Sequence, residues 1–244
     1  MEWWPWRSLC AGSRDAAPVL GTCPMERRAY IAREEKSVAD KPYMIGIAGP
    51  SCSGKSELAM RLASRLPCEA PLIFSLDDYY RDLSHLPPSG REQHNFDDPD
   101  ALEAPLIELH LSALASGEEI HKPRYRFDTH TRAEETDRLE PASFVIVEGL
   151  YALYWSGVRR MLGTKVFIET DDAICFARRL ERDVRERGRN PSFVVSQCSR
   201  HTRPMYERHV LPTKRFADVV VQCKDRADAE AGVAQVLAHL GLPP

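Results

Sequence analysis

Five short runs of almost uninterrupted apolar residues are spread along the chain from residue 44 onwards. A strand that is buried on both faces of a parallel sheet shows this continuous apolar pattern, whereas a half-exposed strand alternates. Each run therefore predicts a central strand of a parallel sheet. The predicted strands are Met44–Ala48, Leu72–Leu76, Phe144–Val147, Val166–Glu169 and Asp218–Val221.

Segments with helical character separate the predicted strands, and Leu58, Leu62 and Leu66 show the helical spacing in the first of them. The alternation of strand and helix predicts an α/β fold with a parallel sheet. Right-handed crossovers then place all strand carboxyl ends at one edge, where such sheets bind ligands. The predicted helices are Glu57–Leu66, Asp100–Ser116, Tyr151–Leu162, Ala173–Arg187 and Ala227–Leu240.

Three polar stretches fall outside this alternation. The proline-containing stretch Leu83–Pro99 predicts a long loop, and Glu119–Glu140 predicts an irregular hairpin outside the core. Residues 1–40 contain three tryptophans within six positions and then show no clear period, so we expect a disordered extension, with Met25 as an alternative start. The remainder, residues 41–244, is expected to form a single domain.

Bulk composition narrows the classes of function. A chain of 244 residues with 43% hydrophobic content can bury one sizeable core. The net charge of −3 gives no basic bias toward nucleic acid or an anionic membrane, and no apolar run approaches the ~18 residues that span a bilayer. The seven scattered cysteines contain no C-x-x-C pair, which favours a reducing, cytoplasmic location over a disulfide framework or zinc site.

A phosphate-binding pattern lies directly after the first predicted strand. The residues Gly49, Pro50, Ser51, Cys52, Ser53, Gly54, Lys55 and Ser56 match G-x-x-x-x-G-K-[ST], the P-loop. A helix follows, so backbone N–H groups and the helix dipole would both favour an anion. The pattern assigns Lys55 to the β- and γ-phosphates and the Ser56 hydroxyl to Mg²⁺.

Carboxylates end two other predicted strands at the same edge. Asp77 and Asp78 follow the second strand, and either could accept a proton from a hydroxyl nucleophile or hold Mg²⁺ through water. The alternative is an acidic helix cap. Glu148 ends the third strand, which is the Walker-B arrangement for organising the Mg²⁺ of a nucleotide.

An arginine-rich stretch, Arg178–Arg189, contains six arginines and three acids. One interpretation is a solvated helix, supported by the i,i+4 pairs Glu181/Arg185 and Asp183/Arg187. The other, which we favour, is a lid that closes over a triphosphate, because arginine neutralises charge on a transferring phosphoryl group.

Two further stretches contain aromatic, histidine and aspartate residues that could bind a base and a sugar: Asn95–Asp100 and Pro123–Arg132. Together with the preceding motifs they resemble, in order and at fitting intervals over about residues 43–221, the uridine/cytidine kinase family of P-loop kinases. The matching pieces are GPSCSGKS, SLDDYY, NFDDPDA, PRYRFDTHTR, VIVEGLYAL, RRLERDVRERGR and LPTKRFADVVV.

The resemblance implies a five-stranded parallel sheet with a β-hairpin and an arginine-rich helical lid, commonly in a homotetramer. It implies transfer of the ATP γ-phosphoryl group to the 5′-hydroxyl of uridine or cytidine in pyrimidine salvage, with Mg²⁺ and with GTP as an alternative donor. It also implies residue roles. Asp77 would be the general base, and Asp97 would hold the ribose hydroxyls. Tyr125 and His130 would recognise the pyrimidine, and the nucleoside would also contact Arg179, Arg189 and Gln197. The phosphates would contact Arg182 and Arg187.

The sequence departs from the family pattern at two places. Arg126 stands where the family usually has an acid, and Gln222–Arg226 stands in place of a glycine-bearing loop near the adenine. Two other functions stay open: a phosphoribulokinase-like or pantothenate kinase-like enzyme, and a nucleotide-binding regulatory protein. The expected partner is a small-molecule nucleoside, with no nucleic acid and no membrane.

Overall fold

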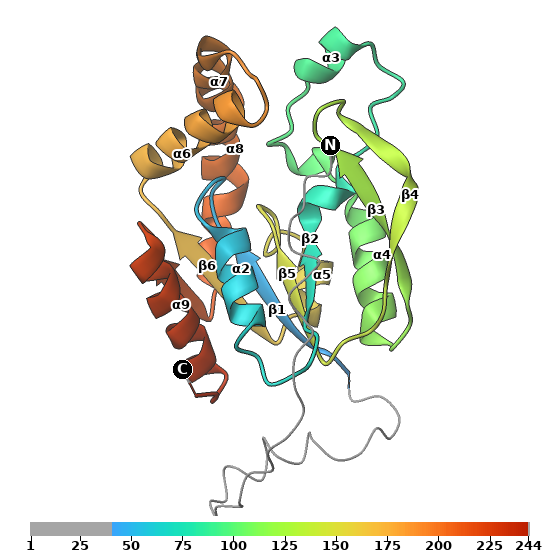
Figure 1. The fold of residues 1–244 in the computed structure, drawn as a ribbon, viewed down its shortest axis with the longest axis vertical. Helices are drawn as coiled ribbons and strands as arrows, with labels where there is room; N and C mark the ends of the chain where they lie inside the picture. The colour runs from blue at the N-terminus through green and yellow to red at the C-terminus, as the bar shows by residue number, and fades with distance from the viewer. Residues whose placement is uncertain (1–40, 244) are drawn as a thin grey trace, which may run out of the picture. The chain divides into compact units, whose positions relative to one another are not determined.

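A five-stranded parallel sheet forms the centre of the computed structural model, which describes residues 41–243 (Figure 1). The extension expected over residues 1–40 lies outside the described residues. All five predicted strands are confirmed, with small shifts at their ends. In sheet order they are β2 (Leu72–Ser75), β5 (Phe144–Glu148), β1 (Tyr43–Ala48), β6 (Thr164–Glu169) and β7 (Val219–Gln222).

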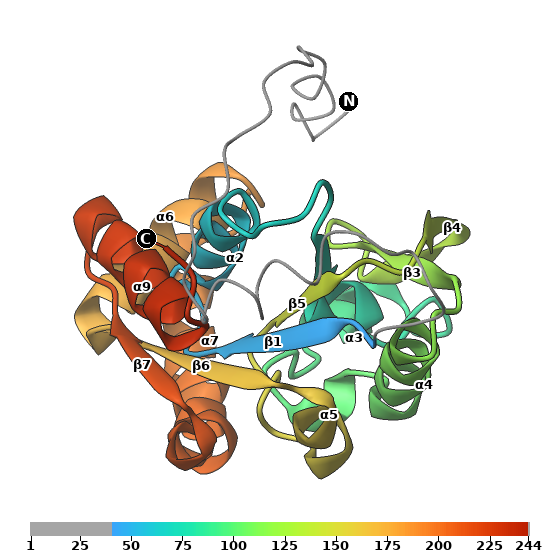
Figure 2. The same cartoon turned by 90° about the horizontal axis from the view of Figure 1, so that it is seen from below.

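Helices bury both faces of the sheet, and this explains the continuous apolar runs. Met44 of β1 packs in a cluster with Leu111 on one face, whereas its neighbour Ile45 packs with Leu58 and Val233 on the other. Figure 2 shows α2 and α9 on the second face and α5 on the first. The covering helices are α2 (Lys55–Ala63), α4 (Ala104–Ala115), α5 (Ser156–Met161) and α9 (Arg226–His239).

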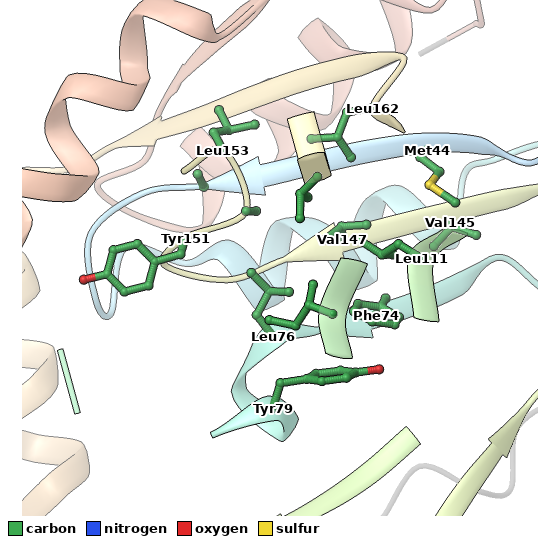
Figure 3. Packing of buried hydrophobic residues seen from close by; sticks show 14 of the residues in the cluster. Met44, Phe74, Leu76, Tyr79, Leu111, Val145, Val147, Tyr151, Leu153 and Leu162 are labelled. Carbon is green, nitrogen blue, oxygen red and sulfur yellow. The ribbon is translucent and has the colours of Figure 1, made fainter. Parts of the chain in front are cut away.

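The cluster drawn in Figure 3 joins the sheet to the segment that follows β2. Phe74 at the end of this strand stacks on Tyr79, with ring centroids 4.9 Å apart, and both side chains are fully buried. Between them the chain forms a 3₁₀ helix, Leu76–Tyr79. Packing of Leu76 and Tyr79 therefore fixes the short segment that contains Asp77 and Asp78.

Two predicted helices are shorter in the structure. The segment expected to be helical over Tyr151–Leu162 is helical only from Ser156, because the consecutive residues Tyr151, Ala152 and Leu153 are all buried, which a one-faced helix does not allow. The helix expected from Asp100 begins at Ala104, after a separate 3₁₀ turn, Pro99–Ala101.

The predicted hairpin is present as β3 (Ile120–Arg126) and β4 (Thr131–Leu139), with a register shift between Pro123 and Tyr125. The expectation that it lies outside the core is wrong for one side of β3. Ile120 joins the core cluster beside α4, and Tyr125 is 8% exposed. The segment expected to be a loop over Leu83–Pro99 contains one short helix, α3 (Pro88–Glu92).

The arginine-rich stretch lies mainly on α6 (Asp172–Arg185), but most of the helical run after it was not predicted. Its start had a signal: Asn190 caps the helix by accepting from the Ser192 N–H at 2.8 Å, and Pro191 occupies the first helical position. The run consists of α7 (Pro191–Gln197), π-helical turns at Cys198–Thr202 and Tyr206–Val210, α8 (Arg203–Met205) and a 3₁₀ segment, Leu211–Phe216.

Figure 1 shows how these parts surround the carboxyl edge of the sheet. The pair α6 and α7 stands on one side, whereas α3 and the β3–β4 hairpin stand on the other. In the part of the chain that the structure describes, no helix has the length and apolar character needed to cross a membrane. The five cysteines of that part are all free thiols.

The buried face of α4 predicts a stability difference within one helix. Leu111→Ala should lower the free energy of unfolding by about 2–5 kcal/mol, because Leu111 is fully buried against the sheet. Leu109→Ala is the matched control: this side chain is 63% exposed, and its removal should change stability by less than about 0.5 kcal/mol. Urea unfolding measures both values, and equal losses would contradict the assigned core.

Candidate active site

The P-loop connects β1 to the first turn of α2, as the sequence predicted. Gly49 and Gly54 both have positive φ angles, and a Cβ at Gly49 would lie 2.6 Å from the backbone oxygen of Ile168. Only glycine relieves both constraints, so the loop can turn tightly against β6. Lys55 folds back over the loop, where its Nζ donates to the Pro50 carbonyl at 2.7 Å.

One buried hydroxyl in the loop lacks a partner. Ser53 is fully buried, and its Oγ has no hydrogen-bond partner among the described residues. A buried polar atom without a partner is unfavourable in a folded protein unless a ligand or water satisfies it. The loop therefore presents the unpartnered Ser53 hydroxyl and the remaining N–H donors of the Lys55 ammonium, in a cradle that suits an anion.

The carboxylate at the end of β5 meets the end of β2. Ser75 and Glu148 are register partners on these neighbouring strands, and the Ser75 hydroxyl donates to Glu148 Oε1 at 2.8 Å. Burial raises the pKa of Glu148, and the charge of Asp77 raises it further, while Lys55 and Ser75 act in the opposite direction. Glu148, Asp77 and Lys55 thus form one electrostatic cluster at the predicted edge.

The two adjacent aspartates have different surroundings, which the sequence did not distinguish. Asp78 forms an ion pair with Lys122 of β3. Burial raises the pKa of Asp78, although the charge of Lys122 acts in the opposite direction. The side chain of Asp77 is exposed, and its backbone N–H donates to the Ser75 Oγ at 3.4 Å as part of the 3₁₀-helix cap. Asp78 therefore ties the hairpin to the sheet, whereas Asp77 is free to meet a ligand.

Asp97, placed by the loop before Pro99, is buried in a hydrogen-bonded network with α6 and α7. It pairs in a bidentate geometry with Arg179, through two contacts of 3.1 Å, and accepts from the Thr202 hydroxyl at 2.8 Å. Gln197 Oε1 accepts from Arg179 at 3.4 Å and from Arg189 at 3.2 Å. The structure thus brings together the residues predicted to hold the ribose and seat the nucleoside.

The remaining predicted residues of the nucleoside site lie on the hairpin. Tyr125 OH and His130 Nδ1 are both buried without a hydrogen-bond partner in the described part of the chain. The His130 ring stacks on Phe96, with centroids 4.3 Å apart. Burial, followed by the charges of Arg189 and Arg187, lowers the pKa of His130 to about 4, so its ring is neutral near pH 7. An uncharged, unsatisfied donor–acceptor pair suits a neutral heterocycle.

Arg126, the departure from the family pattern, does not belong to this pair. Its side chain is 57% exposed and lies 3.7 Å from the Glu135 carboxylate on β4. Tyr125, its neighbour on β3, is buried. Because successive side chains of a strand point to opposite faces, Arg126 points away from the candidate base site.

Four of the six arginines in the predicted lid, Arg179, Arg182, Arg187 and Arg189, converge on Asp183 of α6, which is fully buried. The interpretation of this stretch as a solvated helix is therefore wrong for Asp183, while Glu181 and Arg185 form the predicted exposed pair at 2.7 Å. The Cζ of Arg187 also lies 5.2 Å from the ring centroid of Phe127 on the hairpin side. Sequence spacing gave only one of the partners of Asp183.

The second departure, Gln222–Arg226, lies against the P-loop. Thr170 donates to the backbone oxygens of Ser53 and Cys223, at 3.3 and 2.9 Å, and Arg178 donates to those of Cys52 and Lys224. Thr170, directly after β6, and Arg178 of α6 therefore hold the P-loop and the segment after β7 together.

A cavity of about 390 Å³ adjoins this site and shares only some of its residues. Asp97, Arg179 and Pro50 form part of its wall, but Asp77, Tyr125 and His130 do not line it. The cavity opens instead between α6 and the π-helical turn that contains Thr202. The groups with unsatisfied hydrogen-bonding capacity, rather than the hollow, mark the candidate site.

Comparison with known proteins identifies relatives of this chain. The chain is 42% identical over 183 residues to a uridine kinase of Lactobacillus helveticus, covering 75% of this chain and 87% of that protein. It is 40% identical over 181 residues to a uridine kinase of Deinococcus deserti, with 74% and 87% covered. The solved phosphoribulokinase of Rhodobacter spheroides shares the fold, with a TM-score of 0.57, 14% identity and coverage of 75% and 71%.

A protein-family model also matches this chain. It describes the phosphoribulokinase/uridine kinase family and matches residues 44–230, which include every strand of the sheet except the first residue of β1, together with the P-loop, the hairpin and the arginine-rich helix. The chain therefore belongs to the phosphoribulokinase/uridine kinase family.

Proposed function

We propose that this protein is a nucleoside kinase that transfers the γ-phosphoryl group of ATP to the 5′-hydroxyl of uridine and cytidine. The observation that carries the proposal is the pair of unpartnered polar atoms on the hairpin, Tyr125 OH and a neutral His130. A pyrimidine offers neutral donors and acceptors that match this uncharged pair. The uridine kinases that the chain resembles support the same substrate class.

The nucleotide would lie on Gly49–Ser56, whose free donors fit the phosphates. Ser56 and Glu148 fit Mg²⁺, which proteins commonly bind through one or two carboxylates together with substrate phosphates. When bound, the ion would supply positive charge between the β- and γ-phosphates. Arg182 of α6 and Arg187, just beyond its end, would add positive charge. Asp97, Arg179, Arg189 and Gln197 would position the nucleoside.

Asp77 would act as the general base. Its carboxylate would take the proton of the 5′-hydroxyl as the oxygen forms a bond to the γ-phosphorus, and the bond from that phosphorus to the bridging oxygen of ADP would break in line. Closure of the arginine-rich helix over the phosphates would exclude water, which would otherwise hydrolyse ATP. A cytoplasmic homotetramer with ATP or GTP as donor completes the proposal.

The proposal predicts which acceptors release ADP. Purified protein with Mg·ATP should release ADP with uridine or cytidine, and not with adenosine, ribulose 5-phosphate, pantothenate or no acceptor. Release with another acceptor would retain phosphoryl transfer on the P-loop but reject the assigned roles of Tyr125 and His130. Binding of ATP without release for any acceptor would instead support a regulatory protein.

Adjacent aspartates provide a matched test of the general base. Asp77→Asn should lower kcat by roughly 10²–10⁴-fold while ATP binding is nearly unchanged, because the proton acceptor is lost. Asp78→Asn should lower the melting temperature and leave kcat within a few-fold, since Asp78 pairs with Lys122. Steady-state kinetics and thermal unfolding compare the two variants, and a larger kcat loss for Asp78→Asn would remove Asp77 from the mechanism.

Tyr125→Phe should raise the KM for the nucleoside by roughly 2- to 10-fold, the value of one neutral hydrogen bond of about 0.5–1.5 kcal/mol. The KM for ATP should stay at the wild-type value. Tyr43→Phe serves as the control. Tyr43 is the first residue of β1, at the end of the strand opposite the P-loop, and its hydroxyl contacts that of Thr164 at 2.8 Å. An unchanged nucleoside KM in Tyr125→Phe would exclude this hydroxyl from base recognition.

A further inference from the structure

Asp183 makes more ion pairs than any other acidic side chain in residues 41–243. It lies near the end of α6 with its side chain at 0% exposure, and four guanidinium groups lie within 4 Å of its carboxylate. The closest contacts are Arg182 Nη2 to Oδ1 at 2.8 Å, Arg189 Nη1 to Oδ2 at 3.3 Å, Arg187 Nη1 to Oδ1 at 3.5 Å and Arg179 Nε to Oδ2 at 3.8 Å.

The charge of Asp183 is stable in this position. Burial opposes ionisation, but the charges of Arg182 and Arg187 and a hydrogen bond from Arg182 outweigh it and lower the pKa. A buried carboxylate is tolerated only when such partners satisfy it. Without the negative charge of Asp183, the four guanidinium groups would lie close together with less negative charge near them. Their mutual repulsion would then favour other rotamers of the arginine side chains.

The four arginines belong to two different parts of the proposed site. Arg182 and Arg187 are proposed for the phosphates, whereas Arg179 and Arg189 contact Gln197 and, in the case of Arg179, Asp97. Asp183 is the carboxylate that both pairs share. A guanidinium carries five N–H donors, so a contact with Asp183 leaves other donors free for a ligand. Arg182 uses Nε and Nη2 for this contact, and its Nη1 is not involved.

We infer that Asp183 is a positioning residue that assembles both pairs of arginines before substrate binds and thereby couples the phosphate site to the nucleoside site. It would not touch either substrate. The assignment of the two sites rests on the proposed function, but the role of Asp183 toward the arginines does not depend on which acceptor is phosphorylated. Misplacement of several charged groups by a small distance is enough to cause large losses of rate.

The first test compares Asp183→Asn, which keeps shape and removes charge, with Glu181→Gln on the same helix, whose exposed partner is Arg185. We expect Asp183→Asn to lower kcat/KM on the order of 10²-fold. It should also weaken the binding of a fluorescent ATP analogue. In the wild type, added uridine should change the affinity for this analogue, and Asp183→Asn should abolish that change. Glu181→Gln should match the wild type throughout.

A merely structural role would give a different result. The melting temperature of Asp183→Asn would fall, but the folded fraction would bind the analogue and show the uridine effect as the wild type does; this result would overturn the inference. Analogue binding needs no acceptor turnover, so its loss in Asp183→Asn supports the role of Asp183 even when the acceptor panel rejects a pyrimidine nucleoside.

A second measurement decides the question if Asp183→Asn does not fold. In ¹⁵N-labelled wild-type protein without ligands, the Arg182 Nε–H, assigned by its loss in Arg182→Lys, should exchange slowly, because it donates to Asp183 Oδ1 at 3.0 Å. Free exchange of this proton until ATP analogue and uridine are added would show that the substrates, not Asp183, assemble the arginines.

Discussion

Charged side chains held away from water must find partners, and this constraint determines most contacts at the carboxyl edge of the sheet. Arg179 and Asp97 satisfy each other in a bidentate pair, Glu148 accepts from Ser75, and Lys122 pairs with Asp78. Each pair joins two elements that are far apart in the chain. The same contacts that make burial of charge tolerable therefore hold α6, the Asp97 loop and the hairpin around one site.

The groups that lack partners show where this constraint is relaxed. Ser53 Oγ, Tyr125 OH, His130 Nδ1 and Arg179 Nε are the buried side-chain atoms without a hydrogen-bond partner within residues 41–243. Native proteins keep such atoms mainly where function requires them. The fold thus pairs its buried charges and leaves three neutral groups, together with Arg179 Nε, with hydrogen-bonding capacity for ligands.

Local patterns in the sequence were sufficient to predict the sheet and the P-loop. Continuous apolar runs identify the strands because both faces of the sheet are covered, and the glycine spacing of Gly49 and Gly54 reflects φ angles that other residues rarely adopt. The i,i+4 spacing predicted Arg187 as a partner of Asp183, but the complete burial of Asp183 and the different surroundings of Asp77 and Asp78 could not be predicted in this way. They depend on packing between elements, such as the approach of Lys122 to the 3₁₀ helix, which no local period encodes. The helix expected at Tyr151 failed for the same reason, because the sheet buries three consecutive residues there.

The shared carboxylate of Asp183 also constrains how this site can change over evolutionary time. Replacing one of the four arginines alters the charge balance felt by the other three, so the effect of each substitution depends on which neighbours are still present. Mutations at these positions are therefore epistatic, and a lineage that loses one arginine encounters a different set of tolerated changes at the rest. The effects of replacements at the exposed Glu181–Arg185 pair do not depend on these four arginines in this way. The arginine-rich stretch thus contains two groups of charged positions, one coupled through Asp183 and the other, Glu181 and Arg185, independent of it.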